Sequence, residues 1–211
     1  MVKSNMIAVI DYGAGNIGSV INALKAIGHN PYVTHKPEEV IKAEAVILPG
    51  VGAAGNAMKN LNNLGLSDAI RQVAKEKRPL FAVCIGLQLL FEETEESGCQ
   101  SCLGILPGIV KRFPSKLKVP HMGWNQVTQK KQHLIYAGIP DNTNFYFVHS
   151  YYVIPGNASV ISGTTDYGTE VCSAVAIDNL IATQFHPEKS GISGLQLYRN
   201  FLNMVQGRDT P

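Results

Sequence analysis

A cysteine at a strand-to-helix junction is the first residue in this sequence that could act as a nucleophile. Cys84 follows the apolar run 80–83 and precedes a helical pattern, with the small residues Ala82 and Gly86 on either side of it. A sharp turn there would push the thiol out above a sheet edge, where the N-terminus of the next helix favours the thiolate. The alternative is a small thiol buried in the core, the commoner fate of a lone cysteine.

A histidine and a glutamate at a second strand end could complete such a site. His186 and Glu188 come just after the strand-like run 181–184, and ligands of open α/β sheets usually bind at strand ends. His186 could accept the thiol proton and return it to a leaving group. Glu188, two residues on in an extended chain, could orient the imidazole. Taken alone, the pair could also be a turn histidine and a solvated glutamate.

A glycine pair at a third strand end could stabilise negative charge. Gly50, Val51 and Gly52 follow the apolar run 45–48. Glycines around one small apolar residue let the backbone approach a ligand and aim N–H groups at it, as an oxyanion hole requires. A plain strand-to-loop turn is the alternative, and a Gly-x-Gly alone does not decide between them.

The elements that would position these residues alternate between strands and helices in the first half of the chain. A helix is expected over 17–27, with Asn16 as its N-cap and Gly28 as its stop. Ser67 is expected to cap a second helix, and a third is expected over 85–91. Four apolar runs are predicted to be buried strands, at 6–10, 31–34, 45–48 and 80–83. This alternation indicates a mostly parallel sheet covered by helices.

The second half of the chain is richer in short β-like segments. Strands are predicted at 109–113, 151–154, 174–177 and 181–184, with turns near Gly156 and Asn179, and a helix at 195–205 closes the chain. The sequence has no linker-like stretch, so we expect a single domain over 1–211.

Composition excludes several classes of protein. The chain has 45% hydrophobic and 16% charged residues and a net charge of +2, which fits a globular protein and gives no basic stripe for nucleic acid. Its apolar runs are shorter than the roughly 20 residues of a membrane span, and no signal peptide is evident, so a cytoplasmic location is expected. Cys99 and Cys102 form a C-x-x-C without a second ligand pair, which favours a surface loop over a zinc site.

The three elements, in this order, resemble the class I glutamine amidotransferases, triad enzymes that hydrolyse glutamine through a glutamyl thioester. Longer segments narrow the resemblance to the family's glutaminase subunits of imidazole glycerol phosphate synthase. These segments are Asp11-Tyr12-Gly13-Ala14-Gly15-Asn16, Pro49-Gly50-Val51-Gly52, Pro120-His121-Met122-Gly123-Trp124-Asn125, Tyr146-Phe147-Val148-His149-Ser150-Tyr151 and Gln184-Phe185-His186-Pro187-Glu188-Lys189-Ser190. The resemblance runs from Ile7 to the last helix and implies a flavodoxin-like α/β fold, a mostly parallel or mixed sheet flanked by helices.

The resemblance also implies roles for individual residues. It implies a catalytic triad of Cys84, His186 and Glu188. It implies an oxyanion hole of backbone N–H groups in the region of Gly50, Val51, Gly52 and Ile85. Four further residues resemble those with which the family contacts the α-amino and carboxylate ends of glutamine, namely Gln88, His149, Ser150 and Tyr151.

A partner follows from the same resemblance. Family subunits form a heterodimer with a (β/α)₈ cyclase, which receives the ammonia and makes imidazole glycerol phosphate and AICAR in histidine biosynthesis. Partner-facing positions are expected at Tyr12, Asn16, Trp124 and Lys189. Trp124 could instead be a core aromatic and Asn16 only a helix cap. No cofactor or metal is implied.

One departure and three alternatives stay open. Ala82 stands where the family commonly has glycine, so the turn at Cys84 must form with an alanine. The chain could serve a different synthase, or it could be a catalytically idle scaffold, although its intact triad argues against idleness. Cysteine-elbow peptidases and deglycases are a third class, in which the base usually lies elsewhere. Residues 1–5 match nothing in the family pattern.

Overall fold

The computed structural model describes residues 6–13 and 16–207. Residues 1–5, together with Ala14 and Gly15 of the first motif, lie outside the described part. A five-strand parallel layer forms the centre of the sheet, in the order β2-β1-β3-β4-β13. Its strands are β1 (Ile7–Ile10), β2 (Tyr32–Thr34), β3 (Ala45–Leu48), β4 (Leu80–Val83) and β13 (Leu180–Thr183). This is the flavodoxin-like order, so the expected α/β class is confirmed.

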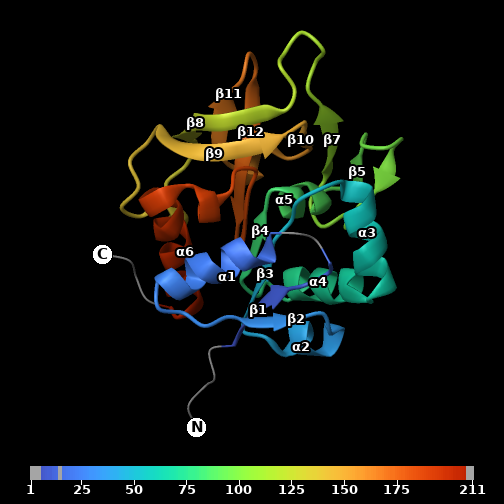
Figure 1. The fold of residues 1–211 in the computed structure, drawn as a ribbon, viewed down its shortest axis with the longest axis vertical. Helices are drawn as coiled ribbons and strands as arrows, with labels where there is room; N and C mark the ends of the chain where they lie inside the picture. Colours follow the sequence, from blue (N-terminus) through green and yellow to red (C-terminus); the bar gives the residue numbers. More distant parts are fainter. Residues whose placement is uncertain (1–5, 14–15, 208–211) are drawn as a thin grey trace.

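Helices cover both faces of this layer. They are α1 (Ile17–Ala26), α2 (Pro37–Lys42), α3 (Ala54–Asn63), α4 (Leu66–Lys75), α5 (Ile85–Leu89) and α6 (Gly191–Val205). Figure 1 shows α1 beside α6 on one side of the strands and α3 with α4 on the other. Phe81 of β4 packs against Tyr198 and Phe201 of α6 with ring centroids 5.4 and 5.3 Å away, so α6 is fixed directly behind the strand that leads to Cys84.

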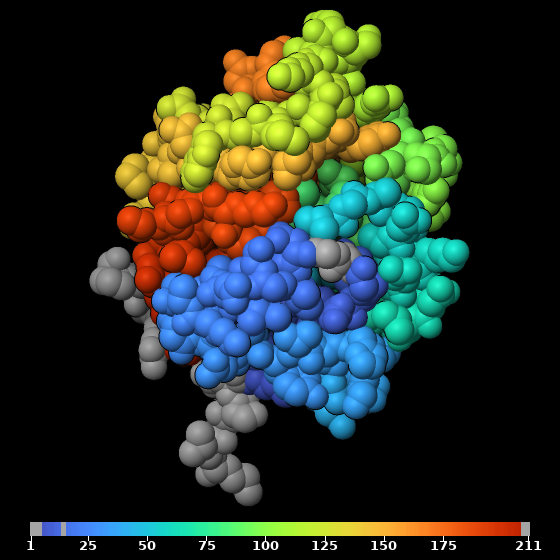
Figure 2. Space-filling view, viewed as in Figure 1, coloured from blue at the N-terminus to red at the C-terminus, as the bar shows by residue number. Residues whose placement is uncertain are grey.

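A mostly antiparallel extension, in which only β5 and β7 pair in parallel among the described strands, continues the sheet beyond β13. It contains β12 (Glu170–Ile177), β10 (Tyr151–Pro155), β7 (Gly108–Arg112), β5 (Glu93–Thr94), β6 (Gln100–Ser101), β11 (Ile161–Asp166), β8 (His121–Gln129) and β9 (Thr143–His149). The 3₁₀ turns are η1 (Leu134–Tyr136), η2 (Ala158–Val160) and η3 (Pro187–Lys189). β8 and β9 pair antiparallel, from His121 opposite His149 to Val127 opposite Thr143. In the space-filling view this extension forms the upper part of the molecule and borders the red residues of α6, below which lies α1 in blue (Figure 2).

Several predicted elements are confirmed. Gly28 has φ +83 and donates to the Lys25 carbonyl at 2.9 Å, so it ends α1 as expected. Strands β3 and β4 have the predicted bounds, and α6 begins a few residues before the predicted 195.

Other expectations were wrong in detail. β2 is an edge strand with Tyr32 43% and Val33 39% exposed, so it is not buried. Ser67 is not the N-cap of α4, because Gly65 occupies that position and the helix begins at Leu66. The Ser67 hydroxyl instead donates to Asn62 Oδ1 at 2.5 Å. The helix after Cys84 ends at Leu89 rather than at 91.

Two properties of the described residues bear on function. Within 6–13 and 16–207, no helix combines the length and apolar character that a bilayer span requires. The same residues contain no group of three or more His, Cys, Asp or Glu side chains placed to hold a metal ion. Cys99 is exposed and Cys102 is buried, both as free thiols, so the predicted surface-loop position is correct only for Cys99.

Candidate active site

The register between β4 and β13 brings the two halves of the site together. These strands are parallel neighbours with Thr183 opposite Val83, and the Cys84 N–H donates to the Thr183 carbonyl at 2.7 Å. Parallel strands end at the same sheet edge, so the residues that follow them emerge side by side. Cys84 and His186 therefore meet although they are far apart in the sequence.

Cys84 occupies the predicted sharp turn. Its backbone has φ +54 and ψ −105, a sparsely populated positive-φ conformation that typically costs about 1–3 kcal/mol for a non-glycine residue. Gly86 is required by packing, because a Cβ there would lie 2.4 Å from the Leu48 carbonyl oxygen. Ala82 has no positive φ and pairs with Leu48 and Ala182 as a regular strand residue. Alanine therefore meets the backbone requirement at the position where the family commonly has glycine.

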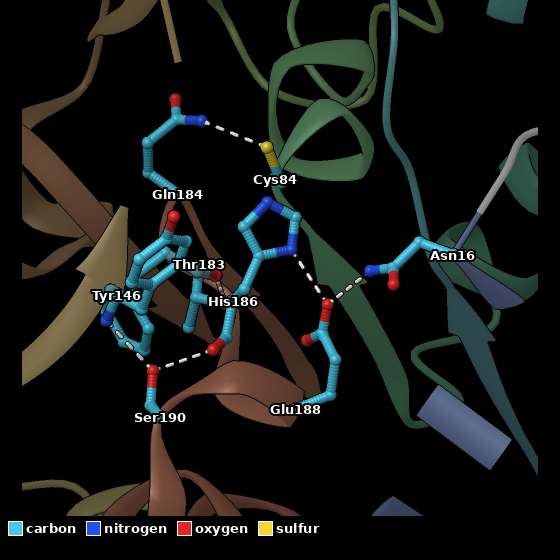
Figure 3. A network of polar contacts seen from close by, with 9 residues as sticks. Asn16, Cys84, Tyr146, Thr183, Gln184, His186, Glu188 and Ser190 are labelled. Atoms are coloured by element: carbon cyan, nitrogen blue, oxygen red, sulfur yellow. Dashed lines mark hydrogen bonds and ion pairs between the residues drawn. The ribbon is translucent and has the colours of Figure 1, made fainter. Parts of the chain in front are cut away.

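His186 and Glu188 form a buried pair. His186 Nδ1 donates to Glu188 Oε1 at 2.7 Å, and both side chains are 0% exposed. The chain between them is the 3₁₀ turn η3, so the expectation of an extended segment was wrong. The turn folds the carboxylate back beneath the ring. Figure 3 shows the imidazole between Glu188 and Cys84, with its second nitrogen on the cysteine side. That Nε2 has no hydrogen-bond partner among the described residues.

Electrostatics favour the protonated imidazole. Burial opposes a charge on His186, but the hydrogen bond to Glu188 and the favourable interactions of the imidazolium with Cys84 and Glu188 outweigh it and raise the pKa of His186 to about 10. An imidazolium between a thiolate and a carboxylate can donate a proton to a departing amine. The geometry thus supplies a nucleophile, a proton carrier and an orienting carboxylate in one cluster.

Asn16 has a different role from the predicted helix cap. It lies at the N-cap position of α1 with φ +86, but its side chain makes no capping bond. Instead Asn16 Nδ2 donates to Glu188 Oε1 at 2.5 Å. The pKa of the buried Tyr198 hydroxyl of α6 is raised by burial and then by the Glu188 charge. Neither this hydroxyl nor Glu188 Oε2 has a hydrogen-bond partner among the described residues, so Asn16 is the side chain that holds the carboxylate from the α1 side.

A cavity of about 550 Å³ opens over this cluster. Most of the predicted substrate-site residues line it, namely Val51, Gly52, Cys84, Ile85, Gln88, His149, Ser150, Tyr151 and His186. Gly50 does not line the cavity. A Cβ at position 50 would lie 2.8 Å from the Gly86 nitrogen. The absence of a side chain at Gly50 therefore allows the chain after β3 to approach α5 closely. Gly52 has φ +94, which glycine adopts without strain.

The substrate-contact candidates are joined by hydrogen bonds. Gln88 is 1% exposed and its Nε2 donates to the Tyr151 carbonyl at 3.0 Å and to Gln184 Oε1 at 3.1 Å. Gln88 Oε1 is buried without a partner in the part of the chain that the structure describes. His149 Nδ1 donates to the same Tyr151 carbonyl at 2.8 Å. Gln88 therefore lines the cavity with its NH₂ group held by the protein and its oxygen unpaired.

The predicted partner-facing residues separate into two groups. Trp124 is 58% exposed, so the core alternative for this residue was wrong. Its ring lies 6.1 Å from that of Tyr146, over which Lys189 Nζ sits at 5.9 Å. We call Met122, Trp124, Tyr146 and Lys189 the Trp124 patch. Tyr12 is 2% exposed and donates to the Pro49 carbonyl at 2.9 Å, so its side chain offers no surface to a partner.

Comparison with known proteins places the chain in a family. The family model for class I glutamine amidotransferases matches residues 8–205. The imidazole glycerol phosphate synthase subunit HisH of Dehalococcoides mccartyi strain CBDB1 is 54% identical over 96% of this chain and 98% of its own length. The chain belongs to the HisH family of class I glutamine amidotransferases. The HisH subunit of Moorella thermoacetica is 50% identical over 95% of both chains.

Solved structures show the same amidotransferase fold at lower identity. A glutamine amidotransferase crystal structure superposes with a TM-score of 0.71 at 21% identity, covering 95% of this chain and 99% of that one. PurLQS from Thermotoga maritima gives a TM-score of 0.75 at 15% identity, covering 95% and 98% of the two chains. At these identities the likeness concerns the fold alone.

Sequence reasoning missed three residues of the HisH site. Gln184 is 0% exposed and its Nε2 donates to Cys84 Sγ at 3.7 Å. Glu96 lines the cavity and accepts from the Ala54 N–H at the start of α3, at 2.5 Å. Asn16 was considered only as a cap or a partner contact. The parallel pairing of β4 with β13 was the available signal for Gln184, whereas Glu96 lies in a loop with no distinguishing pattern.

Proposed function

We propose that this chain hydrolyses L-glutamine to glutamate and ammonia, with Cys84, His186 and Glu188 as its catalytic triad. The ammonia passes to a cyclase partner, which makes imidazole glycerol phosphate and AICAR in histidine biosynthesis. The observation that carries the proposal is the junction of Cys84 with the buried His186–Glu188 pair at the ends of adjacent parallel strands, beneath a cavity. Membership in the HisH family supplies the substrate and the partner.

The reaction proceeds through a thioester. The Cys84 thiolate attacks the glutamine side-chain amide carbon, and backbone N–H groups near Val51 and Ile85 stabilise the oxyanion. His186, holding the thiol proton, gives it to the departing nitrogen, and ammonia leaves. His186 then removes a proton from a water that attacks the thioester, and the thiol regains the proton as glutamate is released. Glu188 keeps Nδ1 of the imidazole as the donor to itself, so Nε2 faces the reaction.

The cavity has groups suited to both ends of the substrate. The unpartnered Gln88 Oε1 is an acceptor for the α-ammonium group. The 149–151 segment lines the same wall and presents backbone groups for the carboxylate. Lys189 lines the cavity as well as the Trp124 patch, so the patch that would meet the cyclase is continuous with the site. A cytoplasmic heterodimer is the assembly we propose.

Ammonia release from glutamine tests the proposal. It should be measured for the chain alone, then with a cyclase subunit of imidazole glycerol phosphate synthase and its nucleotide substrate, and then for Cys84→Ser in the same mixture. We expect release by the wild-type complex and none by the variant. Absence of release from a well-formed wild-type complex would indicate an idle scaffold. Turnover of peptides or glyoxal adducts without glutaminase activity would favour the related cysteine enzymes.

A further inference from the structure

A buried amide contacts the sulfur of the proposed nucleophile. Gln184 is the first residue after β13, and its backbone N–H donates to the Ser173 carbonyl of β12 at 2.8 Å. Its side chain is completely buried and points at Cys84, with Nε2 3.7 Å from Sγ (Figure 3). A sulfur atom is large, so an N–H can donate to it at this separation. The contact lies on the side of Cys84 away from Glu188.

The orientation of this amide follows from its neighbours. The Tyr151 carbonyl can only accept, so the Gln88 atom that lies 3.0 Å from it must be the NH₂ group. The same NH₂ group lies 3.1 Å from Gln184, which must therefore present its oxygen to Gln88. The Gln184 NH₂ group is left for Cys84. Reversing either amide would set a carbonyl oxygen against an oxygen or an NH₂ against an NH₂.

The Tyr151 carbonyl is itself fixed from the other side. His149 Nδ1 donates to it, and His149 Nε2 must then accept from His121 Nδ1 at 2.9 Å. His121 Nε2 in turn accepts from Asn125 Nδ2 at 3.3 Å, and Asn125 also donates to the Asp166 carbonyl at 3.0 Å. Every link has one donor and one acceptor when both imidazoles are neutral. Burial lowers the pKa of His121 to about 4 and that of His149 to about 3, which keeps them neutral near pH 7.

We propose that Gln184 is a further catalytic residue, whose amide N–H donates to the Cys84 thiolate, and that Gln88 is the positioning residue that fixes the direction of this donor. The inference rests on the proposed function of Cys84 as nucleophile. A hydrogen bond to the charged form of a group favours that form. In a buried site this donor stabilises the thiolate together with the His186 imidazolium, and it keeps the sulfur in place while glutamine enters.

Alkylation of Cys84 by iodoacetamide tests the inference without glutamine turnover. The rate should be followed from about pH 5 to 10 in the full chain by mass spectrometry of the Cys84 peptide, with the exposed Cys99 thiol as internal reference. Gln184→Met keeps the length of the side chain and removes the donor. We expect the pH at which the alkylation rate is half-maximal, the midpoint of the profile, to rise by about one unit in this variant. Below the midpoint, its alkylation rate should be roughly tenfold lower than that of wild type. Gln184→Glu should move the midpoint further, because a carboxylate opposes the thiolate.

Gln88→Met tests the positioning role, since it frees the Gln184 amide to rotate. A smaller upward shift of the midpoint is expected. Gln129→Met is the matched control, because Gln129 Nε2 also holds a backbone carbonyl, that of Ile139 at 2.9 Å, but in a different part of the sheet. It should leave the Cys84 profile unchanged. In the cyclase complex, Gln184→Met should lower kcat for glutamine about 10- to 100-fold with KM within about threefold.

Two outcomes separate the inference from the proposed function. If folded Gln184→Met and Gln184→Glu both keep the wild-type alkylation profile, the role of Gln184 is wrong while that of Cys84 stands. If Cys84→Ser retains glutamine hydrolysis, the proposed function is wrong whatever the profile. Melting temperatures of all variants show which of them are folded. If the Cys84 alkylation profile also shifts in Gln129→Met, the shift reflects a general loss of stability, and the inference is overturned.

Discussion

At the scale of single residues, Cys84 supplies the sulfur of the thioester in the proposed mechanism, and its side chain contributes little volume to the core. Cys84→Ala should therefore abolish glutamine hydrolysis while binding to the cyclase and the melting temperature stay close to wild type. Ammonium salts should restore product formation by the variant complex, because the cyclase needs only ammonia. Glutaminase and cyclase assays on the purified complex check this. Loss of the ammonium rescue would mean that Cys84 also supports the partner.

Asn16 and Glu188 allow the orienting part of the triad to be tested in steps. Glu188→Gln removes the charge that accepts from His186, whereas Asn16→Ala removes only a hydrogen bond to that charge. We expect kcat to fall most in His186→Ala, by several orders of magnitude, less in Glu188→Gln, and about tenfold in Asn16→Ala. Asn157→Ala, which removes an exposed cap on η2, should have no effect on kcat. A larger loss in Asn16→Ala than in Glu188→Gln would contradict this order.

The meeting of Cys84, His186 and Glu188 could be predicted from the sequence because they follow recognisable strand ends, and their role as a triad stays a prediction. The contacts around them could not. Asn16 looks like a helix cap, since its type and position suit one, and only the three-dimensional approach of α1 to η3 shows that it holds Glu188. Tyr12 lies in a motif that suggested surface contact, but its ring is buried and its hydroxyl donates to the Pro49 carbonyl just after β3.

At the scale of elements, the junction between β3 and α5 depends on Gly86. An alanine there would place its Cβ 2.4 Å from the Leu48 carbonyl oxygen, which must move. Gly86→Ala should lower the free energy of unfolding by about 1–3 kcal/mol and also reduce glutaminase activity. Gly18→Ala is the matched control, because nothing lies within 4 Å of the added methyl group in α1. It should be neutral or stabilising by up to about 1 kcal/mol. Denaturant titrations check both values.

The pairing of β8 with β9 should make the protein sensitive to acid. The pKa values of His121 and His149 are lowered by burial to about 4 and about 3, against about 6.5 in an unfolded chain. As pH falls from about 6.5 to about 4, the unfolded chain binds protons that the folded chain does not, so the free energy of unfolding falls by about 1 kcal/mol per pH unit for each of the two histidines.

Comparison of variants isolates this contribution. In His121→Phe, the loss of melting temperature between pH 6.5 and 4 should be smaller than in wild type. His35→Phe, at an exposed histidine, should keep the wild-type slope. An equal slope in wild type and His121→Phe would exclude the buried pair as the source.

Prediction of elements succeeded where hydrophobic runs are short and buried on both faces. β3 and β4 are such runs, and their bounds are correct. β8 and β9 were missed because they combine exposed Trp124 with buried His121, so polar and apolar residues do not alternate by face. Ser67 was misplaced because the chain uses Gly65 at the N-cap position, and the serine hydroxyl bonds to Asn62 at the end of α3.

At the scale of the whole molecule, the Trp124 patch is the surface that adjoins the cavity mouth. Exposed aromatic residues at the centre of an interface often contribute most of its binding energy. Trp124→Ala should weaken cyclase binding about 10- to 100-fold while the melting temperature of the free chain changes little. Ile177→Ala is the control, since Ile177 is 37% exposed at the end of β12, where it pairs with Leu180 at the start of β13, and His186 follows the other end of β13. Equal affinity of both variants, measured by calorimetry, would place the cyclase elsewhere.

The parallel register between β4 and β13, in which Val83 lies opposite Thr183, also limits where residues can be inserted or deleted in this chain. A strand advances about 3.3 Å per residue and reverses its side chains at each step. Deleting one residue inside β13 would therefore turn Gln184 and His186 away from Cys84 even if every other side chain were kept. Insertions and deletions are compatible with activity only where the chain leaves the sheet, as at the Asp178–Asn179 turn between β12 and β13. A turn remote from the cavity, such as Asp178–Asn179, can therefore change in length, whereas β4 and β13 must keep their number of residues for Cys84 and His186 to meet.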